Sequence, residues 1–261
     1  MNDAFKPGLL AGKTAFVAGG TSGINLAVAE RFAEQGAKVA VISRSQDKVD
    51  AAVAGLKAKG HEAVGFAADV RDYAAVEAAL KGTHDAFGEI DIILSGAAGN
   101  FVAPALGMSS NGFKTVVDID LIGTFNVLRA SFEFLRKPGA SLISITAPQA
   151  VKPSVMQAHV CAAKAGINML TKVLAMEWGA MGVRVNAISP GPIADTEGMA
   201  RLAPTPEAEA RIKDNIALRR YGEKREIADV ALFLSTDNAA YITGTIIDCD
   251  GGSVLGGTGF G

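Results

Sequence analysis

The chain has 261 residues, of which 49% are hydrophobic and 20% are charged, and its formal net charge is −2. This composition supports a sizeable core and excludes a disordered chain, while the small net charge gives no general attraction to nucleic acid or to an anionic membrane. The expected partners are therefore small molecules and further copies of the chain.

The cysteines and histidines are too few and too scattered for a disulfide framework or a metal site. Cys161 and Cys249 stand far apart, and the three histidines show no metal-ligand spacing. No apolar run of about 18 residues occurs, and the ends show no signal peptide, lipidation motif or peroxisomal signal. We therefore expect a cytoplasmic, reducing location and no metal ion.

Short β-branched runs alternate with longer helical patterns along the whole chain. Strands are predicted at residues 14–18, 39–42, 63–67, 90–94, 141–145, 183–188 and 245–248. Helices are predicted between them, at residues 22–35, 46–59, 73–87, 111–136, 156–179 and 224–235. Most strands are almost wholly apolar, which is typical of parallel strands covered on both faces. The pattern predicts a doubly wound α/β fold, with roughly seven parallel strands and helices on both faces of the sheet.

Residues 194–217 interrupt this alternation and are rich in Pro, Ala and Glu. A segment of this length inside a compact domain is more often a lid over a ligand than a plain connection. We therefore predict a single domain over residues 1–261 that carries a lid at about 194–217.

A glycine-rich turn follows the first predicted strand and precedes the first helix. Gly19, Gly20 and Gly23 allow a tight turn in which backbone N–H groups approach a pyrophosphate at the helix N-terminus. A plain structural turn is the alternative, but the strand–turn–helix context is the one that a dinucleotide site requires.

The end of the second strand bears on which dinucleotide is bound. An NAD site usually places an acid there to hold the ribose 2′-OH, but this chain has Ser43 and Arg44. A cation in that place favours a 2′-phosphate, hence NADPH, although a solvated arginine that starts a helix remains an alternative. Asp69, Val70 and residues 95–99 fall at further strand ends, where ligands collect in such sheets.

These segments, in this order, resemble the short-chain dehydrogenase/reductase family over essentially the whole chain. Lys164 and residues 186–193 and 250–252 agree with it. The resemblance implies a Rossmann-type, NADP-dependent oxidoreductase. By resemblance, the cofactor contacts are Gly19, Thr21, Ser22, Gly23, Ile24, Ser43, Arg44, Asp69, Val70, Ala97, Lys164, Pro190, Gly191, Ile193 and Thr196.

Three positions depart from the family pattern. Asn25 stands where the last glycine of the turn is expected, Val160 replaces the tyrosine four residues before the lysine, and Ala147 replaces a serine. Because valine cannot pass a proton to an alkoxide, ordinary alcohol–ketone chemistry is not expected.

Further segments are similar to the 2,4-dienoyl-CoA reductases, nearest to the peroxisomal type, which also lack that tyrosine. The segments are 97–101, 113–120, 123–127, 177–179, 190–193 and 196–198, with His159 and Lys164. The similarity implies hydride transfer from NADPH to C5 of a 2,4-dienoyl-CoA thioester in the breakdown of unsaturated fatty acids. The substrate partner would be an acyl-CoA.

Asp120 and Lys164 are the catalytic candidates that this resemblance implies. Hydride addition to C5 gives an extended enolate that is protonated on carbon, so we assign proton delivery to Asp120, acting through water. Lys164 is expected to hold the nicotinamide ribose. The alternatives are that Asp120 satisfies buried backbone and that Lys164 is a solvated helix residue.

Substrate contacts are expected at a pocket, at its mouth and in the lid. Asn100, Phe101 and Gln149 are assigned to the pocket, Ser109 and Asn111 to the mouth, and Arg201 to a CoA phosphate. An exposed lid arginine is the alternative for Arg201. His159 and Cys161 are more simply explained as packed residues than as catalytic ones.

The resemblance further implies a homotetramer. One interface would use helices 111–136 and 156–179, and a second the last strand and the tail. The apolar stripe at residues 169–176 is largely explained by core packing. Two other functions stay open: an atypical reductase of another carbonyl or enone, and a non-catalytic NADPH-binding scaffold.

Overall fold

The computed structural model describes residues 5–256 and contains one seven-stranded sheet in the order β3-β2-β1-β4-β5-β6-β7. Every strand pair is parallel, which confirms the predicted fold class. The strands are β1 (Thr14–Ala18), β2 (Lys38–Ser43), β3 (Ala63–Ala67), β4 (Ile92–Ser95), β5 (Ser141–Ile145), β6 (Arg184–Pro190) and β7 (Ile246–Cys249). The central strands are buried on both faces, as their apolar sequences predicted.

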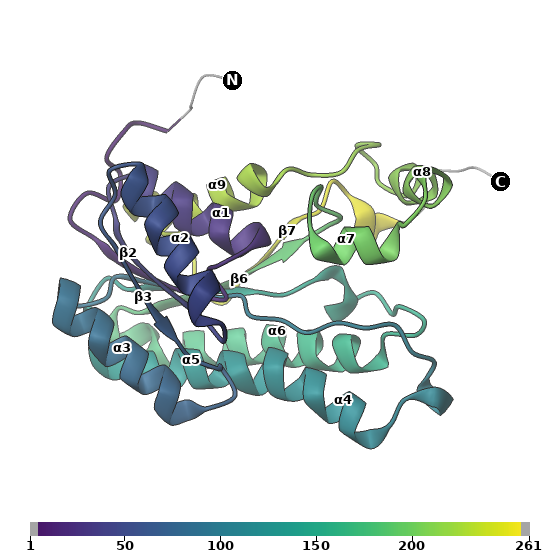
Figure 1. Cartoon of the computed structure of the whole chain (residues 1–261), viewed down its shortest axis with the longest axis horizontal. Helices are drawn as coiled ribbons and strands as arrows, with labels where there is room; N and C mark the ends of the chain where they lie inside the picture. Colours follow the sequence, from purple (N-terminus) through teal and green to yellow (C-terminus); the bar gives the residue numbers. More distant parts are fainter. Residues whose placement is uncertain (1–4, 257–261) are drawn as a thin grey trace.

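Helices cover both faces of the sheet (Figure 1). One layer holds α1 (Gly23–Glu34), α2 (Gln46–Ala58) and α9 (Lys224–Leu234). The other holds α3 (Tyr73–Phe87), α4 (Ser110–Val117), α5 (Gly123–Ser131) and α6 (Ala158–Trp178). Short 3-10 turns occupy Ala105–Gly107, Phe132–Phe134, Pro148–Ala150, Gly179–Met181, Asp237–Ala239 and Ser253–Leu255.

The helix predicted over residues 111–136 is not continuous. Between α4 and α5 the chain forms a π-helical turn at Asp118–Ile122, and after α5 it tightens into a 3-10 turn. Such π turns inside α-helices are frequent at functional sites, and hydrophobic periodicity cannot reveal them because the pattern shifts by a single residue. The π turn contains Asp120, which is buried.

The segment 194–217 contains two short helices that the sequence interpretation did not foresee. They are α7 (Glu197–Leu202) and α8 (Pro206–Asp214), and they lie near the carboxyl end of β7 (Figure 1). Thr196 and Thr205 cap them by accepting hydrogen bonds from the backbone N–H of Met199 and Ala208. These two capping threonines are the local signal that could have predicted the helices.

The order of the strands fixes where a ligand site can form. The chain winds away from β1 in both directions, so β1 pairs with β2 on one side and with β4 on the other. The connections that follow β1 and β4 therefore diverge and leave a crevice at the carboxyl ends of these strands.

Expectations about residues 1–4 and 257–261, including a tail at a subunit interface, lie outside the described residues. Within residues 5–256, no helix is both long enough and apolar enough to cross a membrane.

Candidate active site

A cavity of about 700 Å³ lies in this crevice. Its walls come from the segments that follow β1, β2, β3, β4, β5 and β6, together with α6 and the start of α7. A volume of this size is typical of small-molecule and cofactor sites.

The glycine-rich turn forms one wall of the cavity. Gly19 and Gly23 adopt positive φ values of 76° and 57°, which residues with a side chain rarely adopt. A Cβ at Gly20 would lie 2.9 Å from the carbonyl oxygen of Val17. Ser22 begins α1 without a side-chain capping bond, so the first N–H groups of this helix remain available to an anion. The turn therefore fits the pyrophosphate of a dinucleotide.

Two exposed cations line the cavity near the end of β2. Arg44 and Lys48 make no side-chain hydrogen bond and no ion pair within residues 5–256. Asp69 lines the same cavity. The guanidinium of Arg71, which donates to it, lowers the pKa of its carboxyl below the usual range, and the charge of Arg44 adds to this effect. The sequence interpretation identified Arg44 but missed Lys48, whose signal is its place in the first turn of the helix that Ser45 caps.

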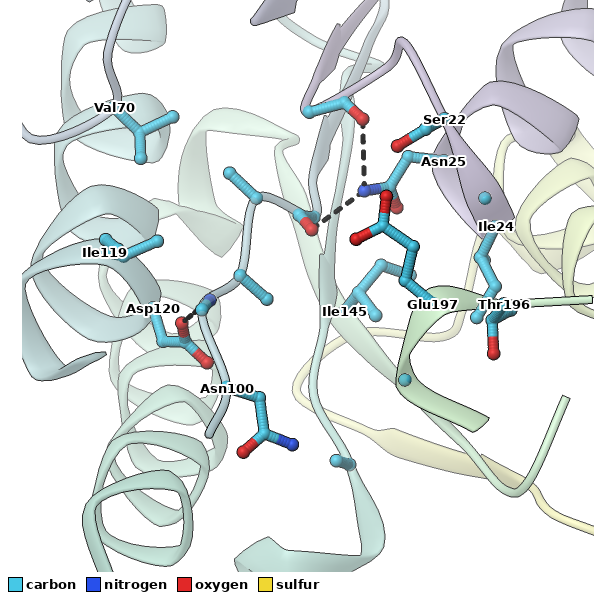
Figure 2. Close-up of a pocket in the computed structure, with 18 of the residues that line it drawn as sticks. Ser22, Ile24, Asn25, Val70, Asn100, Ile119, Asp120, Ile145, Thr196 and Glu197 are labelled. Carbon is cyan, nitrogen blue, oxygen red and sulfur yellow. Dashed lines mark hydrogen bonds between the residues drawn. The ribbon is translucent and has the colours of Figure 1, made fainter. Parts of the chain in front are cut away.

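Asp120 and Lys164 form a buried ion pair at the opposite end of the cavity. Asp120 Oδ1 accepts a hydrogen bond of 2.7 Å from the backbone N–H of Gly99 (Figure 2), and Oδ2 lies 3.2 Å from Lys164 Nζ. The ammonium also donates to the carbonyl oxygen of Ile145 at 3.1 Å. The contact with Lys164 lacks hydrogen-bond geometry, so Asp120 Oδ2 is buried without a hydrogen-bond partner among the described residues. The alternative role of Asp120, satisfying buried backbone, is thus present alongside its pairing with Lys164.

The wall beside this pair carries no phenol. Val160 and Ala147 line the cavity at the positions where a tyrosine and a serine would stand by resemblance. The three tyrosines of the sequence, at positions 73, 221 and 241, are all described and none of them lines the cavity.

The side chains of Gln149, Gln157 and Asn100 form a hydrogen-bonded row of carboxamides. Gln149 Nε2 donates to Gln157 Oε1 at 3.0 Å, and Gln157 Nε2 donates to Asn100 Oδ1 at 3.4 Å. Arg201 of α7 donates to the carbonyl oxygen of Asn100 at 3.3 Å and pairs with Glu197. The row therefore connects the lid segment to the loops that follow β4 and β5.

The structure gathers most of the residues predicted for the cofactor around this one cavity. Of that set, only Ile193 does not line it, since its side chain is buried in the core and faces a second cavity of about 440 Å³.

Among the substrate residues, Asn100 and Gln149 line the cavity, but Phe101, Ser109, Asn111 and Arg201 do not. Ser109 caps α4, and Phe101 packs against the ring of His159 at 4.3 Å between centroids. His159 is fully buried and its ring nitrogens have no hydrogen-bond partner within residues 5–256.

Several wall residues lie outside the predicted set. They are Asn25, Lys48, Ala68, Gly96, Ala98, Gly99, Ile119, Ile145, Thr146, Asp195, Glu197 and Gly198, together with Ile42 and the two substituted positions above. Most are neighbours in sequence of predicted residues. Ile145 and Thr146 were missed because the strand end before Ala147 carries no recognisable motif.

Comparison with known proteins assigns the family. The family model described as enoyl-(acyl carrier protein) reductase matches residues 18–254. The chain belongs to the short-chain dehydrogenase/reductase family. It is an oxidoreductase, and members of this family use a nicotinamide cofactor.

Relatives and solved structures cover nearly the whole chain. A protein of Arabidopsis thaliana named peroxisomal 2,4-dienoyl-CoA reductase is 40% identical over 97% of this chain and 88% of its own. A protein of the same name from Rattus norvegicus is 43% identical over 95% of this chain and 86% of its own. The crystal structure of a dehydrogenase/reductase from Sinorhizobium meliloti matches with a TM-score of 0.88 and 33% identity, over 94% and 97% of the two chains.

The comparison also corrects one expectation. A cytoplasmic location was expected because no targeting signal was recognised, but these relatives are named as peroxisomal enzymes, so that expectation is wrong. The absence of a recognised signal in a sequence was too weak an observation to assign a compartment.

Proposed function

We propose that the chain is an NADPH-dependent reductase of 2,4-dienoyl-CoA thioesters that serves the breakdown of unsaturated fatty acids. The buried Asp120–Lys164 pair, in a cavity wall where Val160 replaces a tyrosine, is the observation that carries this proposal. The two relatives, which are named as producing (3E)-enoyl-CoA, support the same substrate class.

The preference for NADPH rests on the cations at the far end of the cavity. Arg44 and Lys48 make no ion pair within the described residues, and no acid stands at the end of β2 to hold a ribose 2′-OH. A 2′-phosphate would accept charge-assisted hydrogen bonds from both side chains.

The product named for the relatives constrains where the proton must go. When bound, the reduced nicotinamide supplies a hydride to C5 of the dienoyl chain, and the electron pair moves to the thioester oxygen. Protonation of this extended enolate at C2 leaves the remaining double bond between C3 and C4. The proton is added to carbon, so no phenol is needed to protonate an alkoxide.

Asp120 and Lys164 are the residues that we assign to this proton and to the cofactor. Asp120 Oδ2 has no hydrogen-bond donor within residues 5–256, so it is the atom that would hold a water beside the substrate. The Lys164 ammonium donates one hydrogen bond, to Ile145, and lies 3.2 Å from Asp120 Oδ2, so N–H groups are left for a ribose hydroxyl.

We assign the thioester to the part of the cavity that is lined by the carboxamide row. Asn100 Nδ2 makes no hydrogen bond within residues 5–256, and we assign it to the thioester oxygen, where the negative charge develops. Gln149 lines the same side, while Phe101, Ser109, Asn111 and Arg201 surround its mouth as candidate contacts for the acyl chain and the CoA.

The same segments support a lid and an assembly. Asp195 to Gly198 line the cavity and Arg201 reaches Asn100, so residues 194–217 of the single domain are proposed as the lid.

Core packing explains Leu174 but leaves Met169, Val173 and Met176 between 41% and 85% exposed on α6. This exposed face supports the homotetramer, which light scattering of the purified chain would test.

One assay tests the proposed function. Purified chain is expected to oxidise NADPH in the presence of 2,4-hexadienoyl-CoA or 2,4-decadienoyl-CoA and to release a 3-enoyl-CoA, identified by NMR. No oxidation of NADPH with either thioester would reject the proposal. A parallel panel of enones, quinones and 3-ketoacyl thioesters would reveal another substrate, and tight NADPH binding without any turnover would indicate a scaffold.

A further inference from the structure

Asn25, in the first turn of α1, joins the ends of two neighbouring strands through its side chain. Its Nδ2 donates to the carbonyl oxygen of Gly96 at 2.8 Å and to that of Gly19 at 3.4 Å (Figure 2). Ala18 and Ser95 are the last register partners of β1 and β4, and each carbonyl belongs to the residue that follows one of them. The side chain therefore continues the pairing of the two strands at the point where their backbones separate to form the crevice.

This bridge depends on the absence of a side chain at Gly96. A Cβ at that position would lie 2.2 Å from Asn25 Oδ1 and 2.6 Å from Nδ2, which is closer than real Cβ contacts. A Cβ at Gly19 would meet Asn25 Nδ2 at 3.1 Å and the backbone of Ala97 at 3.0 Å. The asparagine and the two glycines, which come from three segments of the chain, thus interlock.

Stability alone does not account for the arrangement. Asn25 Oδ1 is buried and has no hydrogen-bond donor among the described residues, a situation that is unfavourable for a polar atom. Asn25 also lines the cavity, at the strand ends between which a dinucleotide crosses in this fold.

We propose that Asn25 is a positioning residue that fixes the width of the crevice between β1 and β4 and thereby favours binding of the nicotinamide half of the cofactor. The two halves of a dinucleotide lie on opposite sides of this crevice. The half that binds near Arg44 stays on the β1–β2 side, whereas the other half must cross the bridged strand ends to reach Lys164. The inference rests on dinucleotide binding, not on the identity of the acyl substrate.

Three ligands separate this role from a general effect on the turn. NADPH and 2′-phospho-ADP-ribose span the crevice, whereas adenosine 2′,5′-bisphosphate does not. For Asn25→Gly, we expect the first two to bind about 3- to 10-fold more weakly, the factor that one neutral hydrogen bond contributes. The bisphosphate should bind within about twofold of its wild-type affinity. Equal weakening of all three ligands, or no weakening of any, would overturn the proposal.

A second measurement tests the interlocking directly and needs no ligand. Gly96→Ala should lower the melting temperature in the wild-type background, where the new methyl group meets the carboxamide, but not in the Asn25→Gly background. An equal effect in both backgrounds would contradict the arrangement. Asn25→Ala, which suits a helix better than glycine, provides the same titrations if Asn25→Gly does not fold. Because no acyl-CoA is used, these outcomes are independent of the reductase assay.

Discussion

A buried aspartate paired with a cation lies at each end of the parallel strands, and the two aspartates differ in whether both carboxylate oxygens accept a hydrogen bond. At the amino ends of the strands, Asp91 Oδ2 accepts a hydrogen bond from the backbone N–H of Thr14 at 2.8 Å, and Oδ1 accepts one from Arg136 Nε at 2.7 Å. At the carboxyl ends of the strands, Asp120 Oδ1 accepts a hydrogen bond from Gly99, but among the described residues Oδ2 has only the ion contact with Lys164.

The surroundings of the two pairs differ in the same direction. Asp91 directly precedes β4, and its partner Arg136 is half-exposed and also pairs with Glu89. Both Asp120 and Lys164 are at least 93% buried, yet they line the cavity. A buried pair whose hydrogen bonds are complete serves the fold, whereas an incomplete pair that faces a cavity costs stability and is better explained by chemistry.

The largest expected effect comes from neutralising the incomplete pair. Asp120→Asn keeps an oxygen for the Gly99 N–H but cannot carry a proton, so kcat should fall by roughly 10²-fold or more, the usual share of general acid–base catalysis. The affinity for NADPH should change little. Steady-state kinetics with a dienoyl-CoA and a fluorescence titration with NADPH would measure both quantities.

Asp91→Asn is the matched control, because it makes the same substitution at the amino ends of the strands, away from the cavity. Its kcat should stay near the wild-type value. If Asp120→Asn retained full activity, or if both variants lost it equally, the functional difference between the two pairs would be wrong.

The next effect concerns Arg44 and Lys48, which, unlike Arg136 and Lys164, make no ion pair within the described residues. Arg44→Ala and Lys48→Ala should each weaken NADPH binding by about 10-fold or more, as expected for a lost charge-assisted phosphate contact. NADH binding should hardly change. Lys57→Ala, on the helix that carries Lys48 but away from this cavity, is the control. Equal losses for NADPH and NADH would reject the assignment to a 2′-phosphate.

The sequence predicted those parts of the site that depend on local order along the chain. The apolar strands, the turn around Gly19 and the position of Arg44 follow from periodicity and from the strand–turn–helix context. The contact between Asp120 and Gly99 did not follow, because it needs the π turn, which inserts one residue into an otherwise regular helical pattern. The role of Asn25 was also hidden, since its partner Gly96 is 71 residues away.

A smaller effect is expected at the complete pair. Asp91→Ala leaves the backbone N–H of Thr14 buried without an acceptor, which should lower the free energy of unfolding by about 1–3 kcal/mol. Glu89→Ala removes only the exposed partner of Arg136 and should cost less than about 1 kcal/mol. Urea denaturation measures both variants. Equal losses would mean that the Thr14 contact contributes nothing beyond the surface ion pair.

The smallest effect concerns the exposed pair at the base of the lid, where Arg220 holds Glu226. The hydrogen bond from the guanidinium lowers the pKa of the Glu226 carboxyl from 4.5 to about 2. Since the folded pKa is depressed, the stabilisation is fully present above the unfolded value of 4.5 and is lost as the pH falls toward 2.

Glu226→Gln tests this linkage while keeping an acceptor for the N–H of Glu223. Because the pair is partly exposed, we expect the variant to be less stable by only about 0.2–1 kcal/mol at neutral pH. The difference in urea midpoint should shrink as the pH falls below 4.5, and it should be smaller in an Arg220→Gln background, where only the N–H of Glu223 still favours the carboxylate. A difference that stays constant with pH would show that the side chain acts through packing and capping rather than through its charge.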